Sequence, residues 1–172
     1  MKVNHITRYA ILLALAVIVN WIEHMIPLPT LPGIKLGLAN AIGILCLYYL
    51  GPKSYISFGL LRVLLASLLF GTFLGTSFWI SLGGTVLASI TTLILAKLTK
   101  VSIYGISIAA AIMHGLGQVL VVALLYQTAY IISYVLILTI TGSVTGGLVA
   151  YLSTLVIKRV PNKLIKRGST IK

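Results

Sequence analysis

The sequence predicts an all-α integral membrane protein, folded as a compact bundle of six transmembrane helices. Of its 172 residues, 59% are apolar and only 8% are charged, and the mean hydropathy is +1.13. A soluble domain usually carries about 25% charged residues, so polar groups could not cover such an apolar chain. The apolar residues also form six separate runs, which are long enough for helices. Lipid is therefore the expected solvent for most of the protein.

The six apolar runs have lengths and boundaries typical of membrane spans. They cover, in order, residues 7–26, 34–50, 54–70, 77–98, 103–126 and 129–157. A span needs roughly 17–25 residues, so the second and third runs are short and the sixth is long. The proline-rich segment 27–33 ends the first run, and Gly51 with Pro52 separates the second from the third. The break after Gln127 is weak, so five or seven spans remain alternatives.

The positive charges predict that both termini lie in the cytoplasm. With six spans and an internal N-terminus, 11 of the 13 Lys and Arg residues fall on the cytoplasmic side, as the positive-inside rule requires. The net charge of +12 does not indicate a nucleic-acid binder, because the basic residues flank apolar runs. We expect one transmembrane domain over residues 1–160 and a basic cytoplasmic tail over residues 161–172.

Polar residues within the spans are the candidates for function, because they are costly in lipid. Arg62 lies near the middle of the third run, where an arginine costs about 2.5–3.5 kcal/mol on insertion scales. Glu23, the only acidic residue, lies late in the first run, and Asn20 and His24 share its helical face. We expect Arg62 and Glu23 at one polar site in the outward half of the bundle. The alternatives are a purely structural pair, or a Glu23 that meets external water or Lys35.

Four further polar residues would complete this site. Lys35 lies at the mouth of the second run and Asn40 lies within it, while His114 and Gln118 share a face of the fifth run. The two glycines between His114 and Gln118 leave room for a close helix or a ligand. Ordinary hydrogen bonds between helices, and a plain connector around Lys35, are the alternatives. Because two cations would face one carboxylate, we expect an anionic or strongly polar ligand.

Several kinds of chemistry are excluded by what the sequence lacks. It contains no Asp, a single Glu and no Walker motif. A magnesium–diphosphate enzyme needs several carboxylates, and a Ser/His/Asp triad needs an aspartate. The single cysteine, Cys46, excludes an intrachain disulfide, and we expect it to be a core residue. We therefore predict a protein that is not an enzyme and that holds no cofactor or metal.

The stretch Pro-Gly-Ile-Lys-Leu-Gly-Leu-Ala-Asn at residues 32–40, after the proline-rich loop, resembles a bacterial family. Its members are called heptaprenyl diphosphate synthase component I or Gx transporter, and the resemblance covers about residues 8–160. The family is in turn similar to the substrate-binding S components of energy-coupling factor (ECF) transporters. Those proteins have six helices and a substrate site near the external face. The resemblance implies association with a transmembrane coupling subunit and two cytoplasmic ATPases. It also implies that the coupling subunit contacts an Ala-xxx-Ala face on the first helix, which Ala10 and Ala14 match.

The resemblance implies a membrane-embedded substrate-binding subunit of an ECF-type importer in a bacterial cell membrane. Its substrate would be a small, anionic or amphipathic molecule, and the partner ATPases would power transport. Two other functions remain open. One is a non-catalytic membrane subunit of an isoprenoid- or quinone-related complex, which co-purification with a soluble, aspartate-rich synthase would favour. The other is a scaffold without a ligand, which a pocket filled by protein side chains would favour.

Overall fold

The computed structural model describes residues 3–25, 38–98, 101–127 and 133–159, and these form a bundle of six α-helices. The helices are α1 (Val3–Met25), α2 (Leu38–Leu50), α3 (Pro52–Leu69), α4 (Thr76–Leu98), α5 (Ile103–Tyr126) and α6 (Ser133–Arg159). Each matches one predicted run, and no strand occurs among the described residues. The predicted all-α membrane bundle is therefore confirmed.

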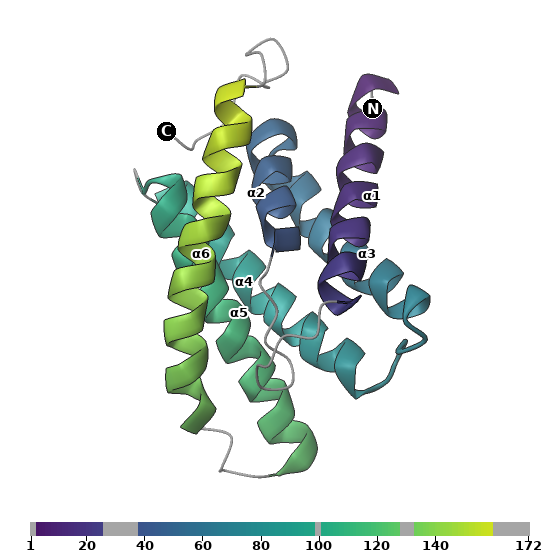
Figure 1. Cartoon of the computed structure of the whole chain (residues 1–172), viewed down its shortest axis with the longest axis vertical. Helices are drawn as coiled ribbons and strands as arrows, with labels where there is room; N and C mark the ends of the chain where they lie inside the picture. Colours follow the sequence, from purple (N-terminus) through teal and green to yellow (C-terminus); the bar gives the residue numbers. More distant parts are fainter. Residues whose placement is uncertain (1–2, 26–37, 99–100, 128–132, 160–172) are drawn as a thin grey trace.

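Five of the six helices are long and apolar enough to cross a membrane, and α2 is shorter. The described part of α2 has 13 residues, which at 1.5 Å per residue reaches about 20 Å. A bilayer core is about 30 Å thick. The second run was expected to begin at residue 34, and residues 34–37 lie outside the described part of the chain. The first turn of the described α2 therefore lies at the depth of the bundle interior (Figure 1).

Helix boundaries follow from local backbone chemistry. Gly51 has a φ of 88°, a left-handed value that favours glycine, and Pro52 opens α3 directly after it. The Ser102 hydroxyl caps α5 by accepting a hydrogen bond from the Gly105 amide at 3.3 Å. Gln127 ends α5 in the left-handed region with a φ of 48°. The weak break after Gln127 is thus a real helix end.

The helices form a closed ring of contacts. Helix α1 packs against α3, α3 against α4, α4 against α5, α5 against α6, α6 against α2, and α2 against α1. Helix α2 also contacts α3, so three helices surround it. The start of α1, the α2–α3 connection and the end of α6 all lie at one end of the bundle (Figure 1). Arg8, Lys53, Lys158 and Arg159 belong to those segments. We predict that this end of the bundle faces the cytoplasm. A topology reporter fused after Lys53 tests this, and a signal typical of the cell exterior would contradict it.

Glycines allow α4, α5 and α6 to pack backbone against backbone. A Cβ added at Gly117 of α5 would lie 2.5 Å from the Gly83 carbonyl oxygen of α4. A Cβ added at Gly146 of α6 would lie 2.7 Å from Cα of Ile108 in α5. Small residues at such crossings are typical of membrane helices, because association in lipid depends on close van der Waals contact. These glycines therefore let α4, α5 and α6 approach one another closely.

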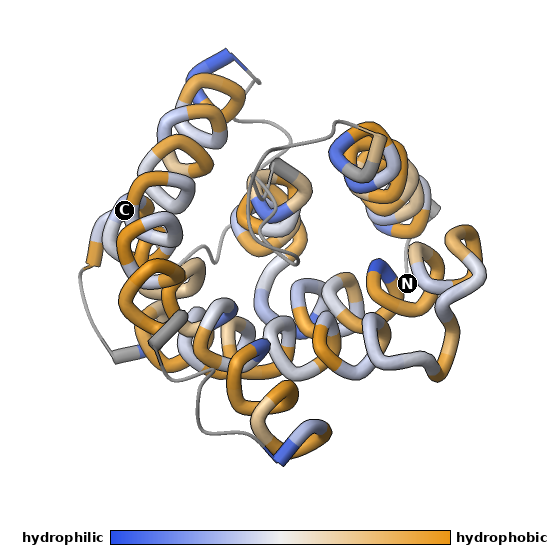
Figure 2. The backbone as a smooth tube through the Cα atoms, turned by 60° about the horizontal axis from the view of Figure 1, so that its bottom comes forward, coloured by the Kyte–Doolittle hydropathy of each residue, from blue (hydrophilic) through white to orange (hydrophobic). Residues whose placement is uncertain are grey.

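Hydrophobic residues occur along all six helices (Figure 2), and many of the large ones are exposed on the outside of the bundle. Large apolar side chains such as Leu124, Leu136 and Val144 are exposed by 77%, 70% and 69%. Soluble monomers rarely expose contiguous patches of more than a few hundred Å², so this surface suits lipid. Inside, Cys46 is fully buried in a cluster with Ala16, Leu50 and Phe58. The prediction that Cys46 is a core residue is confirmed.

Candidate functional site

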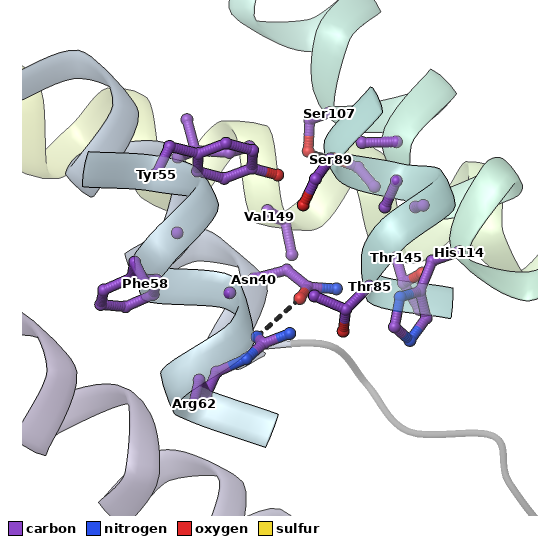
Figure 3. Close-up of a pocket in the computed structure, with 17 residues that line it drawn as sticks. Asn40, Tyr55, Phe58, Arg62, Thr85, Ser89, Ser107, His114, Thr145 and Val149 are labelled. Atoms are coloured by element: carbon purple, nitrogen blue, oxygen red, sulfur yellow. Dashed lines mark hydrogen bonds between the residues drawn. The ribbon is translucent and has the colours of Figure 1, made fainter. Parts of the chain in front are cut away.

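A cavity of about 40 Å³ lies inside the bundle and is lined by five helices, α2 to α6. Figure 3 shows its polar side chains turned toward one another from these helices. Its lining consists of Asn40, Gly43, Ile44, Tyr55, Phe58, Gly59, Arg62, Thr85, Ala88, Ser89, Ser107, Ala110, Ala111, His114, Thr145, Gly146 and Val149. No carboxylate belongs to this lining, so the described wall of the cavity favours an anion over a cation.

Arg62 is the charged group of the cavity. A guanidinium nitrogen of Arg62, on α3, donates a hydrogen bond of 2.7 Å to Oδ1 of Asn40 on α2 (Figure 3). Both side chains are half-buried. The bond holds the guanidinium at the first turn of α2, facing the cavity instead of the lipid. An arginine has five N–H donors, so one bond to Asn40 leaves donors available for a ligand.

Hydroxyl groups line the other end of the cavity. The Tyr55 hydroxyl on α3 lies 3.3 Å from Oγ1 of Thr92 on α4 and points toward Ser89 and Ser107 (Figure 3). Ser107 on α5 donates a hydrogen bond of 2.7 Å to the Gly146 carbonyl oxygen of α6. These bonds tie α3 to α4 and α5 to α6, and bonds between helices stabilise a bundle in lipid. They also place neutral hydroxyl groups opposite the cationic end.

Thr85 differs from the other hydroxyl residues of the cavity. It lies on α4 and is only 4% exposed. Its hydroxyl oxygen is buried and has no hydrogen-bond partner among the described residues. A buried polar group without a partner typically costs about 1–3 kcal/mol. A group that occupied the cavity beside Thr85 would remove this cost.

His114 and Gln118 both pack on Gly84. A Cβ added at Gly84 would lie 2.9 Å from atoms of each side chain, so the glycine is what lets them approach α4. His114 belongs to the lining of the cavity, whereas Gln118 does not. The two residues share a helix face as the spacing predicted, but only His114 reaches the site.

The residues predicted from the first span lie beside the cavity and not in it. Glu23 is 6% exposed and lies within electrostatic range of Arg62. Asn20 is half-buried on the same helix, and neither residue lines the cavity. The side chain of His24 and the whole of Lys35 lie outside the described part of the structure. The structure therefore brings together Arg62, Asn40 and His114, with Glu23 nearby.

Ala10 and Ala14 are both exposed on α1. Ala16 on the same helix is fully buried against α2 and α3. The two exposed alanines thus lie on a part of α1 that the described bundle does not cover.

Sequence reasoning missed the hydroxyl residues of the cavity, namely Tyr55, Thr85, Ser89, Ser107 and Thr145. Serine and threonine are common in membrane helices, because they can bond to the carbonyl one turn earlier. Thr141, for example, donates to the Ile137 carbonyl oxygen at 2.8 Å. A signal was nevertheless present, since Thr85 and Ser89 are four residues apart and share a face of α4.

The fold and the cavity define an all-α membrane protein with a polar site in its interior. A model of the family described as heptaprenyl diphosphate synthase component I matches residues 12–156, and the chain belongs to this family. The resemblance seen at residues 32–40 is thereby confirmed. The family's name describes its members as one component of a larger enzyme system. No curated protein and no solved structure matches the chain significantly.

Proposed function

We propose that the chain is the membrane-embedded substrate-binding subunit of an ECF-type importer for a small, anionic or amphipathic molecule. The observation that carries the proposal is Arg62, whose guanidinium faces a polar cavity between five helices. A charge at this depth is expensive and marks a functional site by default. For a purely structural role we would expect protein side chains to fill the interior. Instead, this cavity contains the Thr85 hydroxyl, which has no hydrogen-bond partner within the described part of the chain.

The energy for transport would come from partner proteins. The sequence has no Walker motif, so ATP would be hydrolysed by two cytoplasmic ATPases that act through a transmembrane coupling subunit. The proposed contact with that subunit is the exposed face of α1 that carries Ala10 and Ala14. Small residues four apart let another helix approach closely.

A second candidate is a non-catalytic membrane subunit of an isoprenoid- or quinone-related complex, which the family's name favours. The chain could not supply the metal-binding carboxylates of such an enzyme, because it has no Asp and one Glu. It would anchor or assist a soluble, aspartate-rich synthase. The partners that remain bound during purification distinguish the two candidates.

Replacing Ala10 and Ala14 together with leucine should disrupt the complex and spare the cavity. The added side chains keep a partner helix from close approach, so the yield of co-purified ATPases should fall about tenfold, equivalent to about 1.4 kcal/mol. The measurement is quantitative mass spectrometry of proteins retained by the tagged chain. The control enlarges two other exposed residues, Val86→Leu on α4 and Val144→Leu on α6. Unchanged ATPase recovery in the alanine variant would contradict the proposed contact.

A further inference from the structure

The cavity has room for one small head group. Its volume is about 40 Å³, and one water occupies about 10–15 Å³ measured in this way, so it holds about three waters. Sites for whole drug-sized ligands measure about 300–1,000 Å³. A carboxylate, with its carbon and two oxygens, fits the available space.

The donors around the cavity suit an oxyanion. Arg62 uses one N–H group on Asn40, and the planar fork of a guanidinium can bind both oxygens of a carboxylate. Thr85 adds a buried hydroxyl that has no partner among the described residues. This hydroxyl is available as a second donor to the anion.

The charges favour a monoanion over a dianion. Arg62 is the permanent cation of the described lining, and the carboxylate of Glu23 lies within electrostatic range of it. A ligand with one negative charge can share the N–H donors of the guanidinium with Glu23. A second negative charge would have no further cation in the described wall and would be repelled by Glu23.

We infer that this cavity binds the carboxylate head group of a monocarboxylate, with the Arg62 fork and the Thr85 hydroxyl as donors. The inference rests on the proposed function and narrows its substrate class. The rest of the molecule lies beyond the cavity, because the head group fills it.

Thermal unfolding of the full chain in lipid nanodiscs tests the inference, with sodium acetate, sodium phosphate and choline chloride as probes at constant ionic strength. Acetate should raise the midpoint saturably, because a ligand that binds the folded state stabilises it. Phosphate and choline should not. Thr85→Val should weaken the acetate affinity about tenfold, the usual effect of losing one hydrogen bond to a charged group. Arg62→Lys, which keeps the charge but loses the fork, should also weaken it.

Thr91→Val is the matched control, because Thr91 lies on the same helix and its hydroxyl bonds to the Leu87 carbonyl oxygen. It should leave the acetate affinity unchanged. Three results would overturn the inference: no saturable effect of acetate, a phosphate effect as large as that of acetate, or an acetate effect that survives Thr85→Val. None of these concerns the ATPase partners. Failure of the importer assignment would appear separately, as the absence of ATPases from the purified complex.

Discussion

Replacing Arg62 with methionine should destabilise the bundle by about 3–5 kcal/mol, the usual cost of removing one partner from a buried charged network. Methionine keeps most of the side-chain length, so the loss comes from the charge and its hydrogen bonds. Oδ1 of Asn40 would lose its donor at 2.7 Å, and buried Glu23 would lose the nearby cation. The measurement is the free energy of unfolding in mixed micelles, with the exposed Lys53→Met on the same helix as a neutral control.

A double variant separates the electrostatic part of this loss. Glu23→Gln removes the carboxylate that Arg62 balances, so Arg62→Met with Glu23→Gln should be about 1 kcal/mol more stable than the two single losses predict. Ligand binding should not return in the double variant, because the Arg62 fork is still missing. Strictly additive losses would show that Glu23 and Arg62 do not share one site.

Replacing Gly117 with alanine should destabilise the protein by about 1–3 kcal/mol, which is typical of overpacking. The added methyl group would lie 2.5 Å from the Gly83 carbonyl oxygen and 2.9 Å from Cα of Gly84. Both are backbone atoms, so no side chain can turn away and α4 must separate from α5. The same unfolding measurement in mixed micelles checks the loss.

Gly147→Ala is the matched control for the helix-packing claim. Gly147 lies in α6, and an added Cβ would meet nothing within 4 Å. Alanine is a better helix residue than glycine, so this variant should gain about 0.5–1 kcal/mol. Equal effects of the two substitutions would contradict the close contact between α4 and α5.

Most of the fold follows from patterns that act over one helix at a time. Long apolar runs must form helices in lipid, because every backbone donor and acceptor needs an internal partner. Gly51 with Pro52 then marks a helix boundary by local chemistry. The second run is one of the two shortest, and α2 is the shortest of the described helices. Residues 34–37 of that run lie outside the described part of the chain.

The sequence indicates the site residues whose side chains are energetically unfavourable in lipid by themselves. It does not indicate the residues whose role depends on which side chains surround them. Arg62 and Asn40 are polar residues in two different apolar runs, and the structure joins them by a hydrogen bond. Gln118 carries the same signal but packs on Gly84 outside the cavity wall, because the rotation of α5 against α4 decides which residue faces inward. For Thr85 the sequence offers only its spacing from Ser89, which puts both on one face of α4. That its hydroxyl has no partner among the described residues depends on how α4 packs.

The most direct test of the central claim is native mass spectrometry of the wild-type chain, purified from its own membranes without added ligand. The account predicts a complex that contains the chain, a transmembrane coupling subunit and ATPases, and a retained small molecule with one carboxylate. Arg62→Lys should lose that molecule while keeping the protein partners. A wild-type chain that carries no small molecule and co-purifies with a soluble synthase, without ATPases, would contradict the account.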